Sequence, residues 1–275
     1  MILIKQSAEY IDGGAFNEES PLQVVYKKIE MAARTCYKSI SKEGVTSEDF
    51  VNKLIAMEHY AMLEHGTVYL KYMFIKGTEN PLDKYRNNPY SKVHTYYVEA
   101  PVETIIVYIT TNYRVLVENN WLDDLKFICS PSSLHPIRMS VRVITDRAVA
   151  QEITRHRTFS FAMESQRYCN YSKDKFGNEV TFIIPSWLED PNNLKGTIFI
   201  NSCKSAEAAY LTLLKSGASP QQARAVLPNA TKTELIITGF YADWEHFFDL
   251  RMRGTTGTPH PDMKELAIKI YNVIK

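Results

Sequence analysis

The most informative stretch of this sequence runs Arg155-His156-Arg157-Thr158-Phe159-Ser160-Phe161-Ala162-Met163-Glu164-Ser165-Gln166-Arg167-Tyr168. It contains three arginines, one histidine and two serines, and its only carboxylate is Glu164. The pattern predicts a short helix over 146–155 and an irregular polar chain from 156 to about 174, so the charges lie where a helix gives way to a loop. Guanidinium groups bind phosphate through paired hydrogen bonds and keep their charge. The stretch therefore predicts a site for a phosphorylated ligand such as a nucleotide monophosphate.

Two other interpretations of this stretch stay open at the level of sequence. It could be a solvated basic face that makes surface ion pairs, or a strip that binds single-stranded nucleic acid by stacking bases on aromatic rings. The apolar side chains of Phe159, Phe161 and Met163 alternate with the charges, which favours packing against a core or a ring system. The formal net charge is only +1 and no second basic run occurs, which weakens the nucleic-acid interpretation.

Hydrophobic periodicity on either side of this stretch predicts a mixture of helices and strands. Helices are expected at 22–37, from Ser47 as N-cap to about 57, at 115–127, 146–155 and 194–215, from Pro220 through Arg224, and at 243–251 and 261–275. Strands are expected at 2–5, 66–75, 104–109, 140–144, 180–184 and 235–240. We therefore predict an α+β fold with a central sheet flanked by helices. Residues 1–275 are expected to form one domain, with an insertion at about 76–136 that contains the turn signal Asn87-Asn88-Pro89.

Composition and missing motifs exclude several classes of protein. Hydrophobic residues make up 45% of the chain, enough for one large or two small cores. The four cysteines form no C-x-x-C pair, which argues against a disulfide framework or a structural zinc site and fits a reducing cytosol. The chain has no H-E-x-x-H motif that would predict a metal site and no G-x-G-x-x-G motif that would predict a Rossmann fold. No apolar run approaches the roughly 20 residues of a membrane span, so a cytoplasmic protein is predicted.

Five segments resemble, in order, those of the flavin-dependent thymidylate synthases. The stretch quoted above is similar to the family signature R-H-R-x-x-S followed by S-x-R-Y. The other four segments are Ala32-Ala33-Arg34-Thr35-Cys36-Tyr37, His59-Tyr60-Ala61-Met62-Leu63-Glu64-His65, Ala223-Arg224-Ala225-Val226-Leu227-Pro228 and Phe247-Phe248-Asp249-Leu250-Arg251. The resemblance covers roughly residues 20–75 and 139–275 and leaves the 76–136 stretch outside.

The resemblance implies a reaction, its ligands and a non-Rossmann flavin site. The family methylates dUMP to dTMP, with methylene-tetrahydrofolate as carbon donor, FAD as cofactor and NADPH as reductant. Its members are homotetramers with sites at subunit interfaces, so Arg224 and Arg251 are expected from a different subunit than Arg155. By position, the residues implied for dUMP are Glu152, Arg155, Met163, Glu164, Ser165, Arg167, Arg224 and Arg251. Those implied for FAD are Cys36, His59, Glu64, Arg155, His156, Arg157 and His246.

The resemblance gives Arg251 the catalytic role. Methyl transfer to C5 of uracil requires electron density at C5, which develops as negative charge on the carbonyl oxygens. A fixed cation beside the ring stabilises that charge in the transition state more than in the ground state. The cysteine-dependent thymidylate synthases instead add a thiolate to C6 from a P-C-H context, and no cysteine of this chain lies in such a context.

Three departures from the family pattern bear on the site. The family's Asn-Glu pair before the second serine reads Ala162-Met163 here, so Met163 would contribute only backbone or Glu164 would replace the missing carboxylate. The segment H-E-T-P-F-E-H common in the family reads here with Ala61 and Met62, so one contact to a flavin hydroxyl is missing. The expected N-x-R reads Phe240-Tyr241-Ala242, and His246 replaces a common asparagine, so the adenine half of FAD would be held differently. The Ala162-Met163 change leaves a catalytically inactive relative that binds nucleotides as a further alternative.

Overall fold

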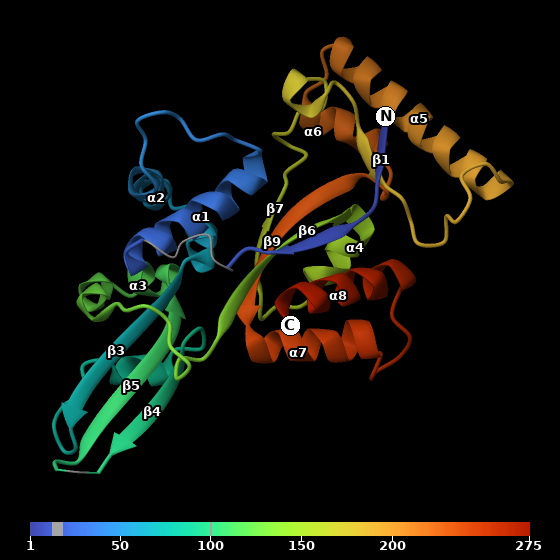
Figure 1. Cartoon of the computed structure of the whole chain (residues 1–275). Coiled ribbons are helices and arrows are strands. Elements are labelled where there is room, and N and C mark those ends of the chain that lie inside the picture. The colour runs from blue at the N-terminus through green and yellow to red at the C-terminus, as the bar shows by residue number, and fades with distance from the viewer. Residues whose placement is uncertain (13–18, 100) are drawn as a thin grey trace.

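A four-stranded antiparallel sheet lies at the centre of the molecule (Figure 1). The computed structural model describes residues 1–12, 19–99 and 101–275. The strand order is β2-β6-β9-β7. The strands are β2 (Ser7–Tyr10), β6 (Arg138–Asp146), β9 (Lys232–Phe240) and β7 (Ser160–Met163). The arginine-rich stretch of the sequence thus enters the edge of this sheet as β7.

Helices cover both faces of the central sheet because successive side chains of β9 point to opposite faces. Leu235 and Ile237 lie in the largest core cluster, together with side chains from α4 (Arg147–Ile153), α7 (Tyr241–Phe248) and α8 (Pro261–Ile274). Ile236 points the other way and packs in a small cluster with Ala32 of α1 (Pro21–Tyr37). The predicted α+β fold, with a central sheet flanked by helices, is confirmed.

Helix α1 begins and ends at residues suited to those positions. The side chain of Ser20 accepts a hydrogen bond from the backbone of Gln23, and Pro21 occupies the first turn, where its missing N–H costs nothing. The helix ends at Lys38, whose φ of 47° lies in the left-handed region. This sharp exit positions the last residues of α1 beside the C-terminal end of β7.

A second, three-stranded sheet projects from the body of the molecule (Figure 1). It consists of β3 (Thr67–Ile75), β5 (Thr104–Asn112) and β4 (Lys92–Val98), in the order β3-β5-β4. Its base packs on α1, on α2 (Ser47–Ala56) and on α3 (Tyr113–Glu118) in a separate core cluster. One domain with an insertion at about 76–136 stays a prediction.

A third group of elements contains the N-terminus. Strand β1 (Ile2–Ile4) pairs in parallel with β8 (Thr181–Ile183). Near them lie the long helix α5 (Leu194–Lys215) and the short helix α6 (Pro220–Ala223), which continues into the 3-10 turn η5 (Arg224–Val226). Their buried side chains form a third core cluster around Phe182 and Tyr210.

Three local predictions were wrong. The helix expected at 115–127 is interrupted after α3, because Asn120 adopts a left-handed φ of 58°, and the chain resumes as the 3-10 helix η3 (Leu122–Phe127). The irregular stretch expected at 156–174 contains β7, which is too short to stand out among its polar neighbours. The N-cap of α2 is Thr46 rather than Ser47, and it forms a reciprocal capping box with Asp49.

The described residues contain neither a membrane-spanning helix nor a cluster of metal ligands. No helix among them is both long and apolar enough to cross a bilayer. No group of three or more His, Cys, Asp or Glu side chains in this part of the chain could hold a metal ion. The cytoplasmic location stays a prediction.

Candidate functional site

The arginine-rich stretch connects two regions of the molecule. It leaves the C-terminal end of α4, pairs with β9 as β7, and ends beside the last turn of α1, where the backbone N–H of Ser165 donates to the carbonyl of Cys36 at 2.9 Å. Most residues implied for nucleotide and flavin binding therefore fall into three groups. Two groups lie near the start of β7, and the third lies where β7 ends beside α1.

The first group joins three of the implied residues, Glu152, His156 and Arg251, within one copy of the chain and next to Arg155 in sequence, whereas Arg251 was expected from a different subunit than Arg155. The guanidinium of Arg251 forms an ion pair with the Glu152 carboxylate at 3.2 Å, and its Nε donates to Nε2 of His156 at 3.0 Å. Because Nε2 accepts this bond, the imidazole is neutral with its proton on Nδ1. Burial, together with the positive charges of Arg251 and His246, lowers the pKa of His156 to about 4.

A change in helix geometry directs Arg251 toward this group. Helix α7 is followed by a π-helical turn, η6 (Asp249–Arg253), which contains Arg251. Such turns are rare and occur often at functional sites, because the wider turn redirects the side chains that follow. His246 lies on α7 itself and is exposed, close enough for its charge to act on His156.

The second group lines a cavity of about 320 Å³ between the base of the projecting sheet and the start of α7. Two residues implied for FAD, Glu64 and Arg157, lie in its wall. The sequence did not single out Arg138, which also lines it and is only 6% exposed. Burial lowers the pKa of Arg138 to about 10. An isolated arginine in a strand carries no local signal that it will be buried.

The third group lies where β7 meets the end of α1. The guanidinium of Arg167 lies over the ring of Tyr168, 5.4 Å from its centroid, and that ring packs on Tyr37 at 5.1 Å. Cys36 lies in the same place, and its Sγ is 3.8 Å from Sδ of Met62. Burial raises the pKa of the Cys36 thiol. Met163 is half-buried against the main core.

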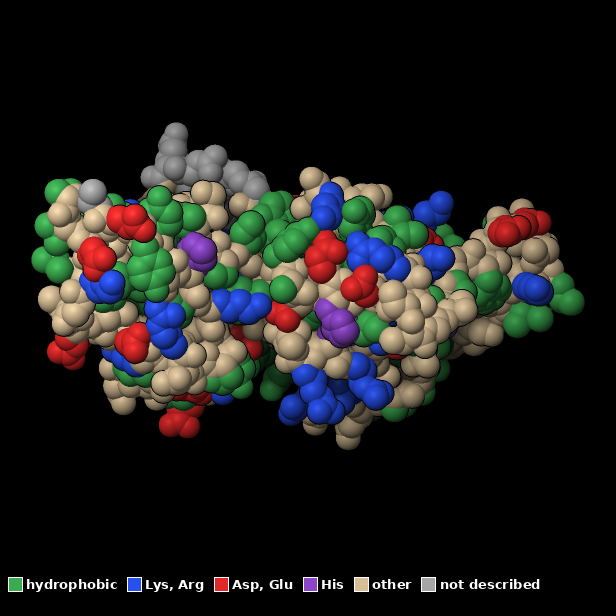
Figure 2. Space-filling model, turned by 90° about the horizontal axis from the view of Figure 1, so that it is seen from below, with side chains coloured by type: hydrophobic (Ala, Val, Ile, Leu, Met, Phe, Trp, Pro, Cys, Tyr) green, Lys and Arg blue, Asp and Glu red, His purple; other side chains and the backbone are tan. Residues whose placement is uncertain are grey.

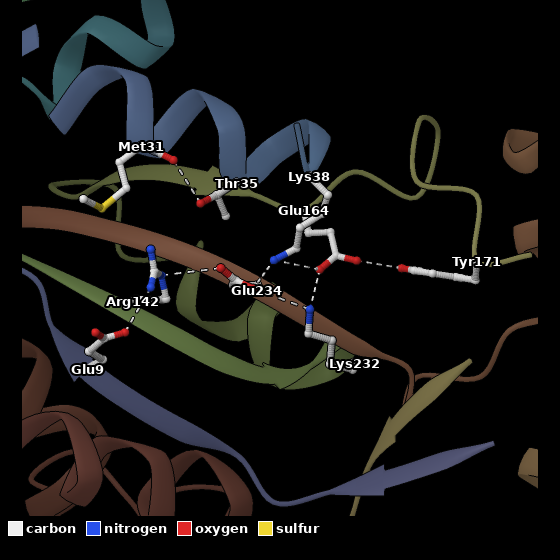
Figure 3. Close-up of polar contacts among 9 residues, drawn as sticks. All are labelled: Glu9, Met31, Thr35, Lys38, Arg142, Glu164, Tyr171, Lys232 and Glu234. Carbon is white, nitrogen blue, oxygen red and sulfur yellow. Dashed lines mark hydrogen bonds and ion pairs between the residues drawn. The ribbon is translucent and has the colours of Figure 1, made fainter. Parts of the chain in front are cut away.

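Glu164 points away from this surface into a network of charges between α1 and β9 (Figure 3). It is 1% exposed, forms an ion pair with Lys232 at 2.6 Å and accepts from the Tyr171 hydroxyl at 3.0 Å. Lys38 donates to Glu234, whose other carboxylate oxygen lies 3.5 Å from Arg142. Together, Glu164, Lys38, Arg142 and Lys232 lie in the wall of a cavity of about 770 Å³.

The charges of this network determine the ionisation of Glu234. Burial alone would raise its pKa, but the hydrogen bond from Lys38 and the charges of Lys38, Lys232 and Arg142 lower it below its usual value. No motif in the sequence pointed to Lys38, Arg142, Lys232 or Glu234. Lys232 and Glu234 are two apart on one strand, so their side chains share a face, which is the one signal that could have indicated a charge pair there.

Four arginines of the implied nucleotide and flavin sites have no charged partner. The side chains of Arg155, Arg157, Arg167 and Arg224 make no hydrogen bond or ion pair with any residue that the structure describes. Six other arginines each lie within 4.0 Å of a carboxylate: Arg34, Arg86, Arg114, Arg142, Arg251 and Arg253. Figure 2 shows a dense group of lysine and arginine side chains at the lower edge of this view, below a histidine.

Two implied residues lie apart from the three groups. His59 is exposed at the start of the 3-10 helix η1 (Tyr60–His65). Arg224 opens η5, next to α6. Within the described chain, neither side chain has a hydrogen bond or ion pair that joins it to the other implied residues.

A family model described as thymidylate synthase complementing protein matches residues 118–275. The flavin-dependent thymidylate synthase of Corynebacterium diphtheriae is 27% identical over 146 residues, which cover 47% of this chain and 53% of the relative. That of Mycolicibacterium gilvum is 35% identical over 140 residues, which cover 45% of this chain and 51% of the relative. The chain thus aligns with about half the length of these curated relatives.

Among solved structures, the chain is similar to the UMP/dUMP methylase PolB from Streptomyces cacaoi bound with 5-Br dUMP. The identity is 17%, the TM-score is 0.46, and the alignment covers 100% of this chain and 92% of that one. The family model, in contrast, takes in more than half of the sequence, including the arginine-rich stretch, Arg224 and Arg251. This chain therefore belongs to the Thy1 family of thymidylate synthase complementing proteins.

Proposed function

We propose that this protein methylates C5 of dUMP to form dTMP, with methylene-tetrahydrofolate as carbon donor, FAD as cofactor and NADPH as reductant. Family membership over residues 118–275 is the observation that carries the proposal. The four unpaired guanidinium groups support it, because arginines without a carboxylate partner are available to an anionic ligand. The printed names of the relatives, flavin-dependent thymidylate synthases, agree with this reaction.

Arg251 is the catalytic residue of the proposal. Its Nε is occupied by His156 and its Nη1 by Glu152, which leaves Nη2 without a hydrogen-bond partner in the described chain. Because His156 and Glu152 already hold the guanidinium, Nη2 can donate to a uracil carbonyl without a further loss of side-chain freedom. The negative charge that develops on this oxygen as C5 becomes nucleophilic is then stabilised by a group already in place.

We assign the dUMP phosphate to arginine and serine side chains from more than one copy of the chain. Arg155, Ser165, Arg167 and Arg224 are the residues proposed to bind it. These residues are spread over both ends of β7 and over η5, and a homotetramer with sites at its interfaces would let copies combine them. Met163 contributes backbone, and Glu164, whose carboxylate is held by Lys232 and Tyr171, takes part through its position rather than through its charge.

The residues beside the start of β7 fit an anionic dinucleotide. Arg138 is buried, and its partners among the described residues are neutral acceptors, the carbonyl of Glu64, Thr67 Oγ1 and Ser160 Oγ. A buried cation with no carboxylate in hydrogen-bond contact is costly, and a phosphate nearby would offset that cost. The residues proposed to hold FAD are Cys36, His59, Glu64, Arg155, His156, Arg157 and His246. When bound, the flavin supplies the hydride chemistry that side chains lack.

Thiol chemistry is not part of the proposal. A cysteine that adds to C6 of uracil must be available as thiolate. Burial raises the pKa of Cys36 and Cys129, and it raises that of Cys203 to about 11. Each of these thiols is therefore protonated at neutral pH, which favours a reaction without an enzyme-bound nucleophile.

The test is release of tritium from dUMP labelled at C5, with NADPH and methylene-tetrahydrofolate present, together with the visible spectrum of the purified protein. We expect flavin absorbance and dUMP-dependent release. Arg251→Ala should reduce release by roughly 100-fold or more while flavin absorbance stays. Arg253→Ala is the matched control, because Arg253 lies on the same π-turn but pairs with Asp249 at the surface.

Each outcome of this test has a clear meaning. Normal turnover in Arg251→Ala would remove the catalytic role of that residue. Flavin and dUMP binding without tritium release by the wild-type protein would favour the inactive relative. Salt-sensitive oligonucleotide binding, without flavin or turnover, would favour the single-stranded nucleic-acid module.

A further inference from the structure

The cavity at the base of the projecting sheet is lined by residues from segments that resemble the family and by residues from the 76–136 stretch, which does not. Glu64 and Arg157 belong to segments that resemble the family and are proposed to bind FAD. Tyr90, Lys92 and Arg114 come from the 76–136 stretch, which no motif explained. The fold therefore brings side chains of the unexplained stretch into the wall of the proposed flavin site.

The cations of this wall are only partly balanced. Four cations and three carboxylates line the cavity, but two of these carboxylates, Glu64 and Glu118, both bind Arg114, at 2.6 and 2.8 Å. Lys92 and Arg157 make no ion pair within the described parts of the chain, and Arg138 donates only to neutral acceptors. The third carboxylate, Asp243, acts on Arg138 through its charge and has no ion pair among the described residues. Three cations, Lys92, Arg138 and Arg157, therefore face one such carboxylate, and this excess of positive charge favours an anionic ligand.

The loop that carries Tyr90 and Lys92 is held in place by hydrogen bonds. The side chain of Asn88 accepts from the backbone of Tyr90 at 2.9 Å and from Ser91 Oγ at 3.1 Å, and Ser91 Oγ donates to Thr111 Oγ1 of β5 at 2.8 Å. Lys92 begins β4, and its Nζ lies 4.3 Å from the centroid of the Phe240 ring. The backbone at Tyr90 and the side chain of Lys92 are therefore positioned before any ligand arrives.

Tyr90 adds an aromatic surface to this cationic cavity. It is 65% exposed and lies in the wall of the cavity, so its ring is open to a ligand there. A ring beside two or three cations is the combination that binds a nucleobase with its phosphates, the base by stacking and the phosphates by charge. The volume of about 320 Å³ lies at the lower end of ligand sites, which suits one half of a dinucleotide.

We propose that Tyr90 and Lys92 bind the adenosine diphosphate half of FAD. They would replace the contacts that the family makes through its N-x-R segment, where this chain has Phe240-Tyr241-Ala242. The inference rests on the proposed function for the identity of the ligand, and it gives the 76–136 stretch a role in binding the cofactor. Arg138 and Arg157 then face the same pyrophosphate from the body of the molecule.

The experiment compares FAD, FMN and ADP on the flavin-free full-length protein. Lys92→Met keeps the apolar stem of the side chain over Phe240 and removes only the charge. We expect its Kd for FAD to rise roughly tenfold, from the loss of one charge-assisted contact, while the Kd for FMN stays the same. ADP should compete with FAD on the wild-type protein and should compete tenfold less well on this variant. Tyr90→Ala should show the same pattern.

Matched controls exist on the same projecting sheet. Lys76→Met removes a lysine that is 60% exposed and pairs with Glu103, and Tyr97→Ala removes a ring that is as exposed as Tyr90 but lies outside the cavity. Circular dichroism checks that every variant is folded. Equal FAD affinity in Lys92→Met and Lys76→Met, or equal weakening of FAD and FMN, would overturn this inference and leave the proposed function standing. A wild-type protein that binds no flavin would overturn both.

Discussion

Lys232 is the cation closest to the almost completely buried carboxylate of Glu164, and removing the Lys232 charge should destabilise the fold. Glu164 and Lys232 are 1% and 16% exposed at the side chain, with 2.6 Å between Oε2 and Nζ. Removing one partner of a buried ion pair costs about 3–5 kcal/mol, because the other charge stays buried. The Tyr171 hydroxyl at 3.0 Å and Lys38 at 3.9 Å remain and offset part of this. We therefore expect Lys232→Met to lower the free energy of unfolding by about 2–4 kcal/mol.

Urea unfolding followed by circular dichroism measures this loss, provided that the slope of the transition is unchanged. The double variant Lys232→Met/Glu164→Gln should recover most of it, because a neutral amide still accepts from Tyr171 and leaves no buried charge. The matched control is Lys76→Met, whose partner Glu103 is 61% exposed, and its change should stay below about 0.5 kcal/mol.

Two results would refute this reasoning. A loss below about 1 kcal/mol in Lys232→Met would mean that Glu164 is solvated, which contradicts its burial. Losses that simply add in the double variant would mean that the two charges do not interact. Glu164→Gln alone also tests the role implied for this residue in dUMP binding. Unchanged dUMP affinity would assign Glu164 to the charge network rather than to the substrate.

Three further predictions concern pH, packing and the cysteines. The pKa values of His156 and His65 in the folded protein, about 4 and about 3, lie below the ordinary 6.5. Their contribution to the free energy of unfolding is therefore fully present above pH 6.5, and it is lost as the pH falls toward 4 because the unfolded chain binds protons first. Urea titrations should lose about 1–2 kcal/mol per histidine between about pH 7.5 and pH 5, and His156→Gln should remove its share; a pH-independent stability would contradict this. Gly239→Ala would place a Cβ 2.2 Å from the ring of Phe159 and should cost about 1–3 kcal/mol in thermal unfolding, partly restored by Phe159→Leu; an unchanged midpoint would refute that packing. Replacing all four cysteines with alanine should leave tritium release measurable, and its complete loss in a folded protein would point to thiol chemistry.

Local sequence signals predicted most elements of the fold, including the short strands β1 and β8, but they missed β2, β4 and β7. The helices over 22–37 and 194–215 have periodicity and terminal residues that leave little alternative, and both were confirmed. Strand β7 was missed because its four residues lie within polar chain and become a strand only by pairing with β9. The break after α3 depends on one residue, Asn120, whose left-handed conformation no neighbouring pattern requires.

The sequence by itself determined the spacing of Arg155, Arg167 and Arg251, the family to which this spacing points, and most of the helices and strands around these residues. Helix periodicity, capping and motif spacing depend on residues only a few positions apart, so they can be read without coordinates. Only the tertiary structure decided which charges meet. Arg251 contacts His156 and Glu152, which lie 95 and 99 residues away in the sequence. Lys92, from the 76–136 stretch, lines the same cavity as Arg157. These contacts depend on how helix and sheet faces pack together, and no local pattern encodes that packing.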